Sequence, residues 1–301
     1  EHIMQLTLVT GMSGAGKSIV IRQLEDCGYY CVDNLPADFL VPLAHRLHTN
    51  GTEHVAVAID ARSQATFDHA LSALKSLQNE GVDVRVLFLT ASQDELVKRF
   101  SETRRRHPLC TRAQRHDQLL TLPEAIQVER DLLAPITELA CVMDTTHLLP
   151  AQLRQWVQQF IGHPHAEMTL TFESFAFKHG LPIAADLVFD VRCLPNPYYD
   201  PALRPLTGKD PEIVTFMEQH PQVADMVSDI QRFIEKWLPL YLQQNRHYLT
   251  VAIGCTGGQH RSVYVAETLT KALRTQCPTI VRHRIIEQKH LLNTQRGTQT
   301  L

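Results

Sequence analysis

The octapeptide GMSGAGKS, at Gly11–Ser18, decides the fold of this chain. An apolar run precedes it at 6–9 and an apolar-periodic segment follows it, so the peptide is predicted to join a buried strand to a helix. Its pattern, G-x-x-x-x-G-K-[ST], is typical of a phosphate-binding loop, in which glycines let backbone N–H groups turn inward around the phosphates of a nucleoside triphosphate. The alternative is an ordinary glycine-rich turn.

The loop residues have separate predicted roles. Lys17 is expected to reach the β and γ phosphates, and the hydroxyl of Ser18 is expected to ligand Mg2+. The N-terminus of the following helix adds partial positive charge at the same point. The predicted nucleotide-binding residues of the loop are Gly11, Met12, Ser13, Gly14, Ala15, Gly16, Lys17 and Ser18.

Length and composition indicate two domains and no membrane segment. The chain has 301 residues, of which 44% are hydrophobic, and a net charge of −3 that gives no global attraction to nucleic acid. Seven cysteines without a CxxC pair fit a reduced, cytoplasmic compartment. A change in composition at 162–165 indicates a linker, so we predict domains at 4–162 and 166–301.

The first domain is predicted to be α/β, with a kinase-like parallel sheet and helices on both faces. Apolar strands at 55–60, 84–90 and 139–144 alternate with amphipathic segments such as 93–106. Ligands bind at the carboxyl ends of such strands. Three aspartates lie at these ends: Asp33, Asp60 and Asp144.

Asp60 follows four apolar residues, as in a Walker B segment, where a carboxylate orients Mg2+ or its water shell. The alternative is a cap for the next helix. Asp33 would be its partner or would accept a proton from a second substrate. Thr145 and Thr146, after the last strand, would face the nucleotide base or cap a helix.

A basic segment at 98–115 follows the predicted strand at 84–90. It contains one acid, Glu102, and seven basic residues: Lys98, Arg99, Arg104, Arg105, Arg106, Arg112 and Arg115. In small P-loop kinases an arginine-rich lid closes over the phosphates at this point, and we predict that Arg105 acts with Lys17 and Asp60 in this way. The alternative, open above all for Arg99 and Arg112, is a solvated helix face.

The second half, predicted as a separate α/β domain, contains a second glycine loop, GCTGGQHRS, at 254–262 between a strand and a helix. Loop amides and a guanidinium there are predicted to bind a phosphate ester. The spacing of Cys255 and Arg261 also matches cysteine phosphatases, and a structural turn is a third alternative. The predicted ligand residues are Cys255, Thr256, Gly257, Gly258, His260, Arg261 and Ser262.

Six motifs spread over almost the whole chain resemble the RapZ/YvcJ family of bacterial P-loop nucleotide-binding proteins. They are GMSGAGKS, EDCGYYCVDNLP, ETRRRHPL, FESFAFKHGLP, FDVRCLPNP and VAIGCTGGQHRSVYVAE. The resemblance implies an N-terminal domain that binds ATP and GTP and hydrolyses them weakly. In the RapZ branch it implies a C-terminal domain that senses glucosamine-6-phosphate and presents small regulatory RNA to ribonuclease E.

Carried over by position, the resemblance assigns ATP to Gly11–Ser18 and the sugar phosphate to 255–262. GTP is assigned to the segment Asp60, Ala61, Arg62 and Ser63. Family members have asparagine where this chain has Ser63, so the base contact departs from the family pattern. We also expect a homo-oligomer.

The C-terminal segment departs from the short basic tail of RapZ. Residues 271–301 hold six Lys or Arg against one acid, Glu287, and the predicted RNA contacts are Arg282, Arg284 and Lys289. A basic amphipathic helix or a frayed end is the alternative.

We predict a regulatory protein with weak ATPase and GTPase activity. No base for the attacking water is apparent in the sequence. A small-molecule kinase and a cysteine-dependent phosphatase remain alternatives.

Overall fold

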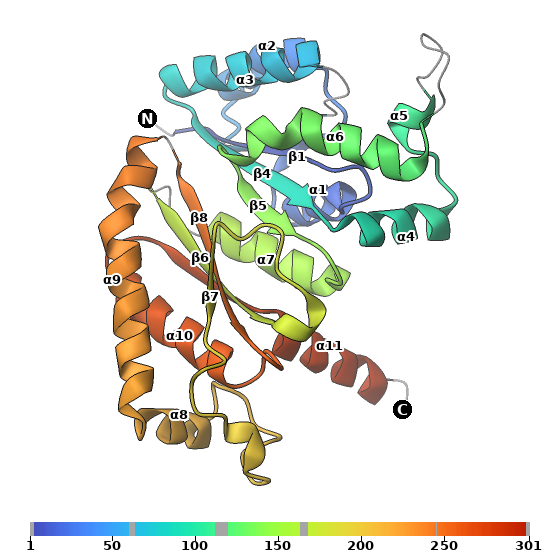
Figure 1. The fold of residues 1–301 in the computed structure, drawn as a ribbon. Helices are drawn as coiled ribbons and strands as arrows, with labels where there is room; N and C mark the ends of the chain where they lie inside the picture. Colours follow the sequence, from blue (N-terminus) through green and yellow to red (C-terminus); the bar gives the residue numbers. More distant parts are fainter. Residues whose placement is uncertain (1–2, 60–63, 112–119, 163–167, 245, 299–301) are drawn as a thin grey trace. The chain divides into compact units, whose positions relative to one another are not determined.

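In the computed structural model, the chain divides into two compact units, Glu1–Gln158 and Gln159–Leu301. The structure describes residues 3–59, 64–111, 120–162, 168–244 and 246–298. Figure 1 shows each unit built around its own sheet.

The first unit contains a parallel five-stranded sheet in the order β2-β3-β1-β4-β5. Its strands are β1 (Gln5–Gly11), β2 (Tyr30–Val32), β3 (His54–Ala58), β4 (Asp83–Thr90) and β5 (Cys141–Asp144). The central strand β1 is buried along its whole length, as expected of a strand covered on both faces. The predicted parallel sheet is therefore confirmed.

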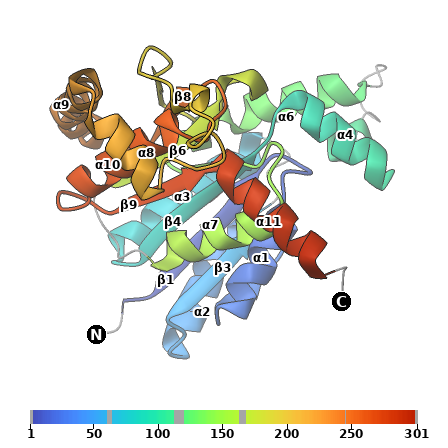
Figure 2. The same ribbon diagram turned by 90° about the horizontal axis from the view of Figure 1, so that it is seen from below.

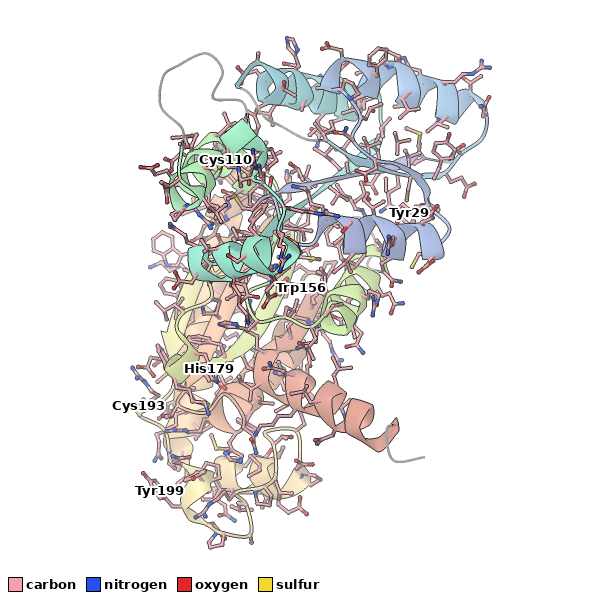
Figure 3. All side chains as sticks on the ribbon, turned by 90° about the vertical axis from the view of Figure 1, so that its right-hand side faces the viewer. Tyr29, Cys110, Trp156, His179, Cys193 and Tyr199 are labelled. Atoms are coloured by element: carbon pink, nitrogen blue, oxygen red, sulfur yellow. The ribbon has the colours of Figure 1, made fainter. Side chains whose placement is uncertain are left out.

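Helices cover both faces of this sheet, with α1 on one side and α2 and α3 on the other (Figure 1). The helices are α1 (Lys17–Asp26), α2 (Leu40–Thr49), α3 (Gln64–Asn79), α4 (Gln93–Thr103), α5 (Pro108–Thr111), α6 (Leu122–Thr137) and α7 (Pro150–Gly162). Apolar side chains of α1, such as Val20 and Leu24, are fully buried. Trp156 of α7, labelled in Figure 3, is 2% exposed.

The second unit contains a parallel four-stranded sheet in the order β7-β8-β6-β9. Its strands are β6 (Thr169–Ala176), β7 (Leu187–Asp190), β8 (Tyr248–Cys255) and β9 (Thr279–His283), and its helices are α8 (Pro211–Glu218), α9 (Pro221–Gln243), α10 (Arg261–Leu273) and α11 (Arg284–Thr298). Helix α10 packs on β6, β8 and β9, and α9 and α8 lie beside it in Figures 1 and 2.

Three parts of the secondary structure are not evident from the sequence pattern. The helix predicted at 93–106 ends at Thr103, because Arg104 has a φ of 52° and the left-handed conformation interrupts a helix. Residues 211–243 form two helices, α8 and α9, since the extended residue before Pro221 separates them. The basic C-terminal segment contains an unpredicted strand, β9.

Within the described ranges, no helix has both the length and the apolar content needed to cross a bilayer.

Candidate functional site

The loop after β1 has a backbone that requires glycine. The φ angles of Gly11, Gly14 and Gly16 are +133°, +82° and +112°. A Cβ atom on Gly11 would lie 2.1 Å from the carbonyl oxygen of Leu89 in the neighbouring strand β4. The glycine spacing that defines the sequence motif is therefore a steric requirement of this turn.

Two side chains hold the outer side of the loop. The hydroxyl of Thr145 donates to the carbonyl oxygen of Ala15 at 2.7 Å, and Nη1 of Arg99 donates to that of Gly14 at 3.1 Å. The C=O of Ala15 and the N–H of Gly16 belong to one trans peptide group and point in opposite directions. Because Thr145 holds the carbonyl toward the outer side of the loop, the N–H of Gly16 points toward the inner side. The sequence did not predict these contacts, in which Arg99 and Thr145 both support the loop through its carbonyl oxygens.

The inner side of the loop fits an anion. Neither Gly14 nor Gly16 donates its amide to another residue of the described ranges. The side chain of Lys17 is close at hand, since its Nζ donates to the carbonyl oxygen of Gly11 at 2.7 Å. Helix α1 carries no acidic residue of its own in its first turn, so no side chain of that turn neutralises the positive end of the helix.

Two residues, Ser18 and Asp60, are predicted to bind Mg2+. Ser18 is exposed in the first turn of α1. The predicted carboxylate partner Asp60, with Ala61, Arg62 and Ser63, lies outside the described residues. Among the residues that the structure does describe, no cluster of three His, Cys, Asp or Glu side chains forms a metal site.

Glu129 of α6 lies at the loop and is absent from the sequence prediction. Its two carboxylate oxygens accept hydrogen bonds from the backbone N–H of Ser13 at 2.6 Å and the hydroxyl of Ser13 at 2.7 Å. Burial acts to raise the pKa of Glu129, but hydrogen bonds from His107 and Ser13 and the charge of Lys17 hold it below its ordinary value. The carboxylate is therefore ionised at neutral pH.

The arginine run is exposed and follows the end of α4. Arg104, Arg105 and Arg106 are all on the surface, whereas the next residue, His107, is buried. Arg112 and Arg115, from the same predicted lid, lie outside the described residues.

The other strand-end aspartates differ in setting. Asp33 is exposed after β2. Asp144 accepts hydrogen bonds from both the amide and the hydroxyl of Thr146, at 3.0 and 2.6 Å, in a local turn. Asp33 therefore remains open to a second substrate, while Asp144 shapes the end of β5.

In the second unit, the loop after β8 encloses a sulfur atom. Sγ of Cys255 accepts a hydrogen bond from the amide of Gly258 at 3.2 Å and lies 3.1 Å from the hydroxyl of Ser262. Cys255 is 3% exposed, whereas Thr256 is exposed and a Cβ on Gly257 would meet no atom within 4 Å. The open side of this loop is therefore at 256–257.

Arg261 is the first residue of α10 and is tied to the proline-rich loop before it. Its Nη1 donates to the carbonyl oxygens of Arg192 at 2.6 Å and Leu194 at 3.0 Å, and the residue is buried. Nε2 of His260 lies 3.2 Å from the carbonyl oxygen of Arg204, and burial lowers the pKa of His260. Both side chains brace the loop, and an anion contact by Arg261 would use its other nitrogens.

The three predicted RNA contacts do not form one exposed basic patch. Arg282, in β9, is 3% exposed, and its Nη2 lies 2.6 Å from Oε2 of Glu287. Arg284 pairs with the buried Glu173 of β6. Lys289, in α11, is exposed and donates to the side chain of Gln259. Arg282 is therefore buried, and carboxylates within its own unit neutralise its charge.

A buried Ser–His–Glu chain crosses the second sheet. Oγ of Ser174 lies 2.8 Å from Nδ1 of His283, whose Nε2 lies 2.7 Å from Oε1 of Glu267. A hydrolase triad uses the same residue types, but there Nε2 of the histidine faces the serine, whereas here Nδ1 does. A nucleophile must also reach its substrate, and Ser174 is 0% exposed. The chain is therefore a structural link between β6, β9 and α10.

We expect this link to stabilise the protein only above acidic pH. The hydrogen bond from His283 lowers the pKa of Glu267 below its unfolded value, so its contribution is present above the unfolded pKa and is lost as the pH falls through the folded one. Glu267→Gln should lower the unfolding free energy by about 1–2 kcal/mol at pH 7. The difference in urea midpoint from the wild type should shrink below about pH 4.

Asp225→Asn is the matched control, since Asp225 is exposed on α9. Equal midpoints for Glu267→Gln and the wild type at pH 7 would contradict the prediction.

Several solved structures are similar to part of the chain. A shikimate kinase from Acinetobacter baumannii in complex with shikimate is 19% identical, with a TM-score of 0.36, over 54% of this chain and 94% of that one. A sugar kinase from Janibacter is 15% identical, with a TM-score of 0.35, over 52% of this chain and 94% of that one.

Curated relatives are similar over nearly the whole chain. A nucleotide-binding protein from Methylobacillus flagellatus is 52% identical over 94% of this chain and 99% of its own length. One from Thiobacillus denitrificans is 52% identical over 93% of this chain and 99% of its own length. Residues 4–164 match the RapZ-like N-terminal domain and residues 168–287 the RapZ C-terminal domain. The chain therefore belongs to the RapZ family of nucleotide-binding proteins.

Proposed function

We propose that the first unit binds ATP and GTP with Mg2+ and hydrolyses them slowly. The observation that carries this proposal is the glycine turn at 11–16, with Lys17 bonded to its rim and its carbonyl groups held from outside. Loop amides and Lys17 would bind the phosphates, and Ser18 with Asp60 would hold Mg2+. The ion would withdraw charge from the phosphates, and the exposed Arg105 would neutralise the rest.

The choice between ATP and GTP comes from the family resemblance. The segment at 60–63 would contact the guanine base, and Ser63 in place of asparagine offers a hydroxyl instead of an amide. We therefore propose that this chain binds both nucleotides.

Calorimetric titration of the full chain with ATP and with GTP tests this proposal. We expect saturable binding of each nucleotide in magnesium buffer, and a slow release of phosphate that stops when EDTA removes the metal. Absence of binding for both nucleotides would overturn it.

A small-molecule kinase is the second candidate for this unit, and the exposed Asp33 at the end of β2 favours it. A carboxylate there would accept the proton of a second substrate's hydroxyl as phosphate is transferred. ADP release that depends on one added metabolite would select this function over simple hydrolysis.

We propose that the loop at 255–262 of the second unit binds a sugar phosphate such as glucosamine-6-phosphate. Its open side at 256–257 and the start of α10 support an anion site. The phosphatase alternative is less favoured, because the sulfur of Cys255 is buried and hydrogen-bonded. Binding of the sugar phosphate without release of inorganic phosphate would separate the two functions.

We propose RNA binding and presentation to ribonuclease E from the family resemblance alone. Homo-oligomer formation is a separate proposal. With Arg282 buried and Arg284 ion-paired, Lys289 is the member of the predicted set that is exposed to a phosphate backbone.

A further inference from the structure

Helix α6 places a negatively charged side chain against the phosphate-binding loop, which is unusual for a site that binds anions. Glu129 is 6% exposed, and its carboxylate binds Ser13 through both the amide and the hydroxyl of that residue. Ser13 lies within the motif whose amides surround phosphates. The chain thus places a fixed negative charge against a loop built to hold anions.

The same carboxylate lies in the field of the loop lysine. The charge of Lys17 acts on Glu129, and Lys17 is the residue that such loops direct toward the β and γ phosphates. A terminal phosphate would therefore compete with the Glu129 carboxylate for the Lys17 ammonium and the Ser13 amide. Like charges a few ångströms apart in a partly buried site repel strongly.

The side chain of His107 also lies beside the Glu129 carboxylate. Nδ1 of His107 accepts the backbone N–H of Leu109 at 3.1 Å, which leaves the proton on Nε2, 3.5 Å from Oε2 of Glu129. His107 is buried, so its ring adjoins the carboxylate away from bulk water. Glu129 is thus a built-in anion at the phosphate end of the site.

We propose that Glu129 sets the selectivity between nucleoside diphosphate and triphosphate, disfavouring the triphosphate through repulsion of its γ-phosphate. This rests on the proposed nucleotide binding by the loop. A diphosphate lacks the group that approaches Glu129 most closely, so it binds without displacing the carboxylate from Ser13. A triphosphate must either break the two Ser13 hydrogen bonds or tolerate the charge.

The test is the ratio of ATP to ADP affinity in the full chain, measured by calorimetry in magnesium buffer. Glu129→Gln keeps an acceptor for Ser13 but removes the charge, and it should raise the ratio about tenfold or more. Asp131→Asn, on the exposed face of α6, controls for the loss of one charge from the same helix.

An unchanged or lowered ratio in Glu129→Gln overturns the inference, whatever happens to the hydrolysis rate. Glu129→Ala gives the same readout if the glutamine variant does not fold. If neither nucleotide binds to the wild type or to any variant, the proposed function itself has failed. If both bind and only the ratio does not move, the function stands and the role of Glu129 does not.

Discussion

Replacing Lys17 with alanine is expected to weaken the binding of both ATP and GTP by about a hundredfold or more. The ammonium lies 2.7 Å from the carbonyl oxygen of Gly11, at the rim of the loop, so a small movement brings it to a bound phosphate. Two charge-assisted hydrogen bonds to phosphate contribute about 3 kcal/mol together, which corresponds to roughly two orders of magnitude in affinity. Calorimetric titration in magnesium buffer measures the effect.

Lys75→Ala provides the matched control, because Lys75 is exposed on α3 and its loss changes the net charge equally. Lys75→Ala should keep both the nucleotide affinity and the thermal unfolding midpoint of the wild type. If Lys17→Ala binds both nucleotides with undiminished affinity, the loop is a structural turn and not a nucleotide site.

Gly11→Ala is expected to destabilise the first unit by at least about 3 kcal/mol and to abolish nucleotide binding. The added Cβ would lie 2.1 Å from the carbonyl oxygen of Leu89, a backbone atom that cannot rotate away, and the φ of +133° disfavours alanine in any case. The strand pair β1–β4 or the loop must move to accommodate it. Urea unfolding in a Trp237→Phe background reports on this unit, since Trp156 is then the remaining tryptophan.

Gly28→Ala separates the two causes. Gly28 also has a positive φ, +87°, but a Cβ there would meet no atom within 4 Å. It should cost about 1–2 kcal/mol from backbone strain alone and leave nucleotide affinity unchanged. Equal losses of stability in the two variants would contradict a steric role for Leu89.

Local patterns account for the parts of the fold that the sequence predicts. The parallel sheet, the turn at 11–18 and the helix after it follow from apolar runs and glycine spacing within about 20 residues, which is the range where periodicity is informative. The support of the loop comes from much farther along the chain. Thr145 reaches Ala15 across 130 residues, and Glu129 reaches Ser13 across 116. No spacing rule links such pairs.

The C-terminal segment shows how a charged composition misleads. The sequence TIVRH at 279–283 contains Arg and His, which indicate exposure when the sequence is read alone. In the sheet, Arg282 is paired in register with Glu173 and His283 with Ser174. Because β6 supplies an acid and a hydroxyl at these positions, Arg282 and His283 have polar partners where they are buried. Only the pairing register, which the sequence does not display, reveals this.

The bracing of the loop by Arg99 and Thr145 has a consequence for recognition. Since these two side chains already fix the peptide planes around Gly14 and Ala15, the cradle is preorganised before any nucleotide arrives. Association then requires little ordering of the main chain, and the entropic penalty falls mainly on the incoming polyphosphate and the Lys17 side chain.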